Sequence, residues 1–115
     1  MDRSKSLGFI EVSGVVAAID ALDIMTKSAN VRLVTWERKL GGRLVTVVVT
    51  GDIAAVNSAV ENACRQTIKK PVAHLVLASP HEETWKMVEF SAKRLQKNEK
   101  REELEKEEGY QEVHF

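Results

Sequence analysis

The chain has 115 residues, 43% of them hydrophobic, and its 17 basic residues are matched by 17 acidic ones. This length and composition predict one soluble globular domain. A formal charge of zero gives no general attraction to phosphate backbones, which argues against a nucleic-acid binder. Cys64 is the single cysteine, so a reducing cytoplasm is the expected location. No apolar run approaches the ~20 residues that cross a bilayer, and the first residues do not resemble a targeting segment.

The first quarter of the chain predicts a strand followed by a helix. Residues 7–12 form a short apolar segment bounded by Ser6 and by Ser13-Gly14, which is typical of a strand. Over residues 15–29 the larger apolar side chains recur every three or four positions, at Val15, Ile19, Leu22 and Met25. That spacing places them on one face of a helix. Asn30 tolerates the left-handed backbone that often follows a helix, so we expect the helix to end there.

The middle of the chain predicts a hairpin, a second helix and a fourth strand. Residues 31–38 and 44–50 are strands, the second almost continuously apolar as in a sheet interior, and residues 39–43 join them. Asp52 is placed to act as the N-cap of a helix. The apolar positions of that helix are Ile53, Val56, Val60, Ala63 and Cys64. Residues 72–79 predict another strand, which Pro80 closes.

The resulting βαββαβ order predicts an α+β, ferredoxin-like fold, in which two helices cover one face of a four-stranded antiparallel sheet. The other face then needs a further helix, a ligand or another subunit. From residue 82 a third helix is expected, with Trp85, Val88, Ala92 and Leu95 at helical spacing before charged residues take over. We expect its beginning to dock on the domain and the remainder to project into solvent. Gly109 is expected to end it, leaving a tail that is disordered or binds a partner.

No catalytic or metal-binding constellation is predicted. Cys64 belongs to the apolar positions of the second helix, which favours core packing over a nucleophilic role. His74 lies in an apolar strand, His81 at the start of a helix and His114 in the tail, and their spacing matches no metal site. The sequence therefore predicts neither an enzyme nor a cofactor or metal.

Four stretches in the right order resemble the bacterial microcompartment shell proteins of the single-domain, hexamer-forming kind. They are the opening "LGFIEVSG", the "KSAN" of residues 27–30, "LVTVVVTGDIAAV" of residues 44–56 and the closing Pro80-His81. The resemblance extends from Leu7 to about Val88. It implies a structural protein, located in a microcompartment shell in the cytoplasm, of which six copies form a flat disc and discs tile edge to edge.

The resemblance also implies roles for individual residues. The loop before the third strand would line a central pore for small polar or anionic metabolites, with Lys39, Leu40, Gly41, Gly42 and Arg43 as its lining. Lys27, Asn30, Ser79 and His81 would lie at the edge between discs. The implied partners are further copies of the chain, other shell proteins and enclosed cargo enzymes, with no nucleic acid and no membrane. The expected division is a shell domain at 1–88 and a charged helical extension at 89–115, which contacts cargo, caps one face of the disc or is solvated.

Two departures from the family pattern, one electrostatic expectation and one alternative function stay open at the level of sequence. The loop at residues 39–43 looks one residue longer than usual, and a hairpin turn alone would explain Gly41-Gly42. Repulsion between six loops predicts that some of their cations point away or pair with Glu37. Ser79 occupies a position where the family commonly has arginine, which predicts weaker tiling. The alternative is a ferredoxin-like small-molecule-sensing module, which ligand-dependent stabilisation without sheet assembly would favour.

Overall fold

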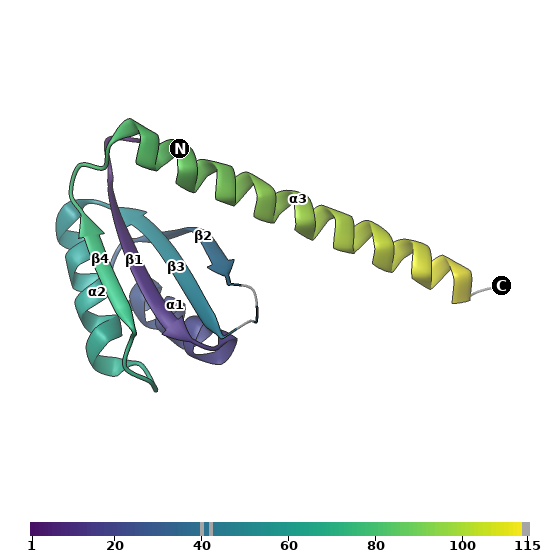
Figure 1. The fold of residues 1–115 in the computed structure, drawn as a ribbon, viewed down its shortest axis with the longest axis horizontal. Helices are drawn as coiled ribbons and strands as arrows, with labels where there is room; N and C mark the ends of the chain where they lie inside the picture. Colours follow the sequence, from purple (N-terminus) through teal and green to yellow (C-terminus); the bar gives the residue numbers. More distant parts are fainter. Residues whose placement is uncertain (40, 42, 114–115) are drawn as a thin grey trace.

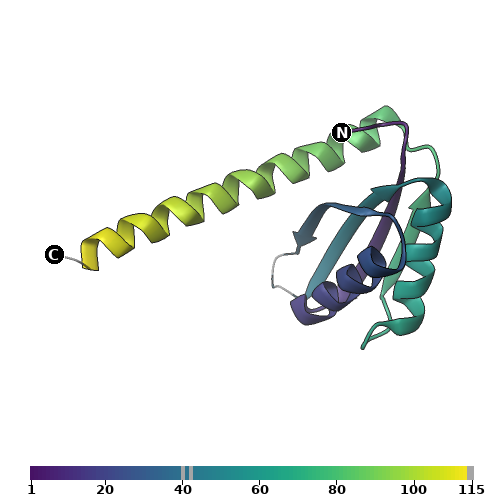
Figure 2. The ribbon, with the colours of Figure 1, turned by 180° about the vertical axis from the view of Figure 1, so that it is seen from behind.

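The computed structural model describes residues 1–39, 41 and 43–113 of the chain, with side chains as far as residue 107. Its elements are β1 (Ser6–Ser13), α1 (Val15–Ser28), β2 (Arg32–Arg38), β3 (Leu44–Gly51), α2 (Ile53–Gln66), β4 (Ala73–Leu77) and α3 (Glu82–Val113). The strands form one antiparallel sheet in the order β2-β3-β1-β4. Helices α1 and α2 cover one face, and α3 crosses the other (Figures 1 and 2). The predicted α+β, βαββαβ fold is confirmed.

The main core lies between the sheet and the helix pair α1 and α2. Alternate residues of β1 and β3 point into it, because successive side chains of a strand face opposite sides of the sheet. The buried members are Ile10, Val12, Val45, Val47 and Val49 from the strands, Ala17, Ala18, Ala21 and Met25 from α1, Val31, and Val56, Ala59, Val60 and Ala63 from α2. Gly8 lets α2 approach closely, since a Cβ there would lie 2.8 Å from Cγ1 of Val56. Small residues on both helices therefore set how near they sit to the sheet.

A second, smaller apolar cluster lies on the opposite face, under the beginning of α3. Its buried members are Leu7, Val48, Trp85 and Val88, with Phe9 and Val34 packed beside them. The Trp85 side chain is 1% exposed. This cluster confirms that the beginning of α3 docks on the domain, and it identifies a further helix as the cover of the second sheet face.

Helix α1 departs from its predicted pattern. Met25 is buried, but Ile19 is 63% exposed and Val15 is 38% exposed, while the alanines between them are buried. The helix lies too close to the sheet for its large β-branched residues to fit underneath, so alanines make the contact. The prediction that Asn30 adopts a left-handed backbone conformation is also wrong. Ala29 follows the helix in an extended conformation, and no described non-glycine residue has a positive φ.

Helix α2 and strand β4 show smaller departures. Asp52 occupies the N-cap position of α2, but its side chain makes no capping hydrogen bond. Its carboxylate instead pairs with Lys5 across 2.6 Å. Strand β4 is an edge strand, and His74 on it is exposed although its neighbours in the sequence are apolar.

Helix α3 continues through Gly109 to Val113, so the predicted end at Gly109 is wrong. A glycine lowers helix propensity by about 1 kcal/mol relative to alanine, but it does not prevent helical backbone angles. His114 and Phe115, which belong to the predicted tail, lie outside the described residues. The described residues of α3 beyond Leu95 are exposed as far as residue 107, as expected of a solvated projection.

Candidate functional site

The loop between β2 and β3 closes the hairpin around residues 40–43. The backbone N–H of Lys39 donates to the carbonyl of Leu44 at 3.1 Å, which marks the last pair before the loop. Gly41 has a φ of +97°, and open space surrounds the position that a Cβ would take. Glycine is therefore needed there for its backbone angle and not for lack of room. Leu40 and Gly42, which the sequence also places in the loop, lie outside the described residues.

The two cations of the loop have different surroundings. The Nζ atom of Lys39 lies 3.5 Å from Oε2 of Glu11 on β1, and Glu11 also accepts a hydrogen bond from Thr46. Arg43 is exposed, and its carbonyl accepts the N–H of Gly14 at 2.6 Å. Lys39 is thus partly neutralised by its own chain, whereas the guanidinium of Arg43 faces solvent.

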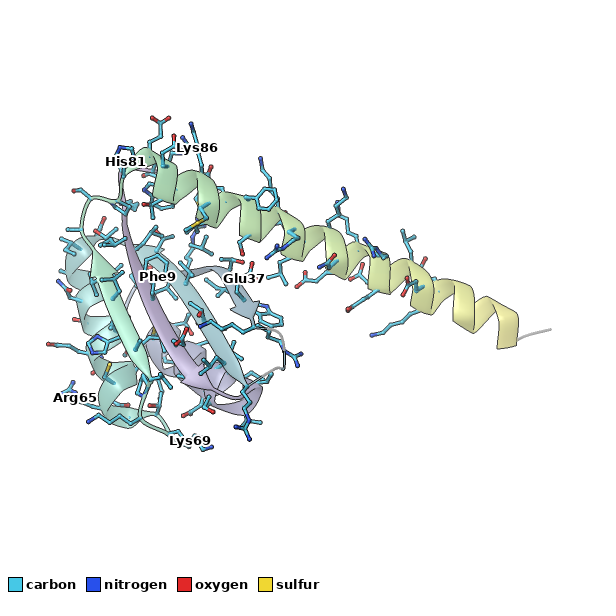
Figure 3. All side chains as sticks on the ribbon, viewed as in Figure 1. Phe9, Glu37, Arg65, Lys69, His81 and Lys86 are labelled. Atoms are coloured by element: carbon cyan, nitrogen blue, oxygen red, sulfur yellow. The ribbon has the colours of Figure 1, made fainter. Side chains whose placement is uncertain are left out.

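Of the two expected arrangements of the loop cations, pairing with Glu37 is not found among the described residues, whereas Arg43 points into solvent. Its Oε1 accepts a hydrogen bond from Oγ of Ser91 at 2.5 Å and pairs with the guanidinium of Arg94, both on α3. Figure 3 shows Glu37 on β2, on the side of the strand that α3 crosses. The tertiary fold brings Arg94 to it, and nothing in the local sequence indicates this contact.

The four predicted edge residues lie in or beside two turns, one between α1 and β2 and the other between β4 and α3. Lys27 is exposed near the end of α1, where it pairs with Asp23 across 2.9 Å. The carbonyl of Asn30 is 2.8 Å from the position of a Cβ on Gly51, so this turn packs tightly against the end of β3. Ser79 and His81 are exposed between β4 and α3. His81, labelled in Figure 3, accepts the backbone N–H of Glu83 on Nδ1 at 3.0 Å and so caps the start of α3.

The strand register separates these edge residues from the loop. At one end of the sheet, Arg32 pairs with Thr50 and Leu7 pairs with Leu77, so the turns that carry Asn30 and Ser79 lie at that end. At the opposite end, Arg38 pairs with Val45, next to the loop. The structure therefore places the predicted pore loop and the predicted edge residues at opposite ends of one sheet.

An apolar groove between α1 and β2 is the feature that sequence reasoning missed. It encloses about 240 Å³. Its lining is Val15, Ala18, Ile19, Leu22, Leu33, Trp36, Val45 and Val47. The available signal was that apolar residues surround α1 on more than one side, since Val15, Val16 and Ile19 cannot all share one stripe with Ala17 and Ala21. An exposed apolar surface beside an unpaired edge strand is typical of a protein–protein interface.

The reactive side chains of the described residues do not form a catalytic centre. Cys64 packs against the main core, and burial raises the pKa of its thiol, partly offset by Lys70, which favours the unreactive protonated form. His74 shares a surface cavity of about 420 Å³ with Cys64 and Arg65. Within the described part of the chain, no three histidine, cysteine or acidic residues gather as a metal site would require. His114 is not among the described residues.

An α+β domain with two edge strands and an exposed apolar groove has the kinds of surface through which subunits of assembly proteins contact one another. The BMC domain family model matches residues 6–80, which is more than half of the chain. The chain belongs to this family of bacterial microcompartment shell proteins. In the described residues, no helix is both long and apolar enough to span a membrane.

Known relatives agree with this assignment. The chain is 47% identical over 85 residues to the carboxysome shell protein CsoS1A of Hydrogenovibrio crunogenus, covering 71% of this chain and 88% of that protein. It is 41% identical over 88 residues to the microcompartment shell protein PduA of Citrobacter freundii, covering 75% and 94%. The predicted family, the structural, non-enzymatic role and the location in a microcompartment shell are thus confirmed.

A solved structure also shares the fold. It is a microcompartments protein from Desulfitobacterium hafniense, with a TM-score of 0.66 and 25% identity over 76% of this chain. The match covers 48% of that solved chain, so the present chain spans about half its length.

Proposed function

We propose that six copies of this chain form a shell tile whose β2–β3 loops, residues 39–43, line a central pore for small polar or anionic metabolites. The proposal is supported by the distance along the sheet between the predicted pore loop and the predicted edge residues. The loop lies at one end, and the turns carrying Asn30 and Ser79 lie at the other. A flat ring needs this arrangement, with one end of each subunit at the axis and the other at the rim.

The apolar groove between α1 and β2 is the proposed contact between neighbouring copies. Leu33 and Ile19 are 41% and 63% exposed in the single chain, and β2 is an edge strand with one side unpaired. Burial of such side chains stabilises association by roughly 25 cal/mol for each Å² of apolar surface removed from water. Because the groove lies along β2, a copy seated in it brings its own loop close to the loop at the end of that strand.

The chemistry of the loop supports passage of polar or anionic solutes. Gly41 allows six backbones to approach one axis, and main-chain N–H groups then attract negative charge. Arg43, repeated sixfold, gives the pore a positive potential. Lys39 contributes less of that potential because Glu11 accompanies it.

The proposed contacts between tiles involve Lys27, Asn30, Ser79 and His81. All four are exposed, as contact residues at a rim must be. Ser79 offers one hydroxyl where arginine would offer five planar donors. We therefore expect Ser79→Arg to increase sheet formation seen by electron microscopy, with Ser58→Arg on the exposed face of α2 as the control. Equal sheet formation in the two variants would contradict the edge role of Ser79.

The test of the tile and pore combines native mass with flux. We expect a mass of six chains, and a monomeric mass across a broad concentration range would overturn the proposal. In assembled shells, Arg43→Glu should reduce the flux of anionic metabolites while leaving assembly intact. Arg65→Glu, the same charge change on the exposed end of α2, should leave the flux unchanged. Equal fluxes through the two variants would count against a pore role for the loop.

The domain division and the contact with cargo enzymes remain predictions. The division into a shell domain at 1–88 and an extension at 89–115 is one, because the family match ends at residue 80 and α3 runs across both positions. Contact between the extension and cargo enzymes is the other. Removal of residues 96–115 tests the second prediction, since cargo contact there would be lost while the tile still forms.

A further inference from the structure

The first half of α3 is held firmly against the sheet. Trp85 and Val88 are buried against the sheet, and Ala92 is 8% exposed. Polar contacts then continue the attachment, because Ser91 and Arg94 both bind the carboxylate of Glu37. The direction in which α3 leaves the domain is therefore set by the packed structure.

That direction follows strand β2 toward the loop. Thr35 meets Ser91 at 2.8 Å, and farther along both elements Arg38 and Asn98 line one cavity. Three strand residues and seven helix residues each span about 10 Å, so the two elements run parallel over this stretch. Residues 99–113 then continue for about 22 Å beyond the end of β2. Figures 1 and 2 both show α3 extending beyond the sheet on the side of β2.

The projecting segment, residues 96–113, is called the arm below. Over residues 97–103 its charges are sorted into two stripes, and the sorting ends there because Lys106 follows the acidic positions and Glu108 follows the basic ones. The acidic stripe, Glu99, Glu102 and Glu103, follows Leu95 at intervals of four, seven and eight and so continues the docked side of the helix. The basic stripe is Lys97, Lys100 and Arg101. Lys97 is two residues from Leu95, which corresponds to about 200° around the helix, so the stripes lie on opposite sides.

The arm has little to hold it together on its own. Its described side chains are exposed, and none of the ion pairs found in the described residues joins two residues of the arm. Isolated helices of about 12–15 residues are marginal in water, and a segment whose side chains are mostly charged gains nothing from an apolar seam. A binding partner with complementary charge would therefore stabilise the helical conformation of the arm.

We propose that this partner is the arm of another copy of the same chain, the acidic stripe of one arm facing the basic stripe of the next. The contact joins two different sides of the helix, so it is heterologous and repeats around a closed ring. The inference rests on the proposed hexamer, in which the loop ends of six copies meet at one axis. The six arms, each directed past its own loop, then gather on one face of the disc and form a collar around the pore mouth.

The experiment reports on the distance between arms in the full-length chain. Cys64→Ala removes the single native thiol, and Glu107→Cys places one thiol on the arm outside both stripes. A short, flexible bis-maleimide should then link arms within each six-chain assembly, giving covalent products up to six chains on a denaturing gel. Native mass before and after linking gives the number of chains in the assembly.

Three charge variants provide the matched controls. Reversal of the acidic stripe by E99K, E102K and E103K, or of the basic stripe by K97E, K100E and R101E, should abolish the linked products because the facing stripes then repel. All six substitutions together restore complementarity and the original net charge, so linking should return. Recovery in the combined variant distinguishes pairing of stripes from a general effect of charge.

The outcomes separate this inference from the proposed function. Six-chain assemblies that give no linked arms would overturn the collar and leave the tile standing. Linking that persists in both single-stripe variants, or that joins only chains of different discs into twelve-chain species, would also overturn the collar. A monomeric mass would overturn the proposed function, and the collar with it.

Discussion

The two faces of the sheet are covered in different ways. The face under α1 and α2 is a continuous apolar core, to which strands β1 and β3 and both helices contribute. The face under α3 has four buried apolar residues and is supplemented by polar contacts at both ends, Arg3 to Glu89 and Glu82 near the start and Glu37 to Arg94 farther along. The first face therefore makes the domain stable, whereas the second attaches a helix and sets its direction.

The largest expected effect is on the first face. Met25 is fully buried in the main core, so Met25→Ala should lower the free energy of unfolding by about 2–5 kcal/mol, through lost apolar burial and the cavity left behind. Urea denaturation monitored by circular dichroism measures this change in unfolding free energy. Met87→Ala, on an exposed position of α3, should stay within about 0.5 kcal/mol. Similar losses of unfolding free energy in the two variants would contradict the conclusion that the core under α1 and α2 makes the domain stable.

Trp85→Ala should have a smaller effect on the whole domain and a larger one on α3. Truncation of a buried tryptophan costs about 3–5 kcal/mol when the structure stays in place. Here α3 can leave the sheet, so the loss for the domain is limited to the docking energy of the helix. We expect a smaller shift in urea than for Met25→Ala, with rapid cleavage of α3 in limited proteolysis. Lys86→Ala, whose side chain points into solvent (Figure 3), is the control, and unchanged cleavage of Trp85→Ala would contradict the docking role.

Glu37→Ala tests the polar half of the attachment. The carboxylate binds Ser91 and Arg94 at a half-exposed position, so its removal should weaken docking by only about 1 kcal/mol. Proteolysis of α3 should accelerate less than in Trp85→Ala, and the unfolding midpoint should hardly move. Glu105→Ala, on the arm and outside both stripes, is the matched control, and equal cleavage of these two variants would show that the Glu37 contacts do not hold the helix.

The smallest expected effect is a dependence on pH near the start of α3. The hydrogen bond from Arg3 lowers the pKa of Glu89 below its ordinary value of 4.5. A carboxylate with a lowered pKa stabilises the folded chain fully above its ordinary pKa, and the contribution disappears as pH falls through the lowered value. Protection of α3 from an acid-active protease should therefore decline below about pH 4.5, and less so in Glu89→Gln. Parallel declines in the two proteins would assign the effect to other carboxylates.

Local pattern was a good guide wherever neighbouring residues decide the structure. The β-branched run of Leu44–Thr50 predicted an interior strand, and the spacing of Val56, Val60 and Ala63 predicted the buried side of α2. Trp85 and Val88 predicted the docked part of α3 in the same way. The shell family followed from the resemblance of four motifs in order, and the BMC domain family model matches residues 6–80, where these motifs lie except for His81.

The sequence by itself thus determined the element order, the α+β fold, the family and the structural role of the chain. Only the tertiary structure decided which side chains are covered and paired. Val15 and Ile19 border a groove because α1 rests on its alanines, Asp52 binds Lys5 instead of capping α2, and Glu37 holds Arg94 from a distant helix. These outcomes depend on distances between elements far apart in the chain, and the periodicity of one element contains no information about the separation between two.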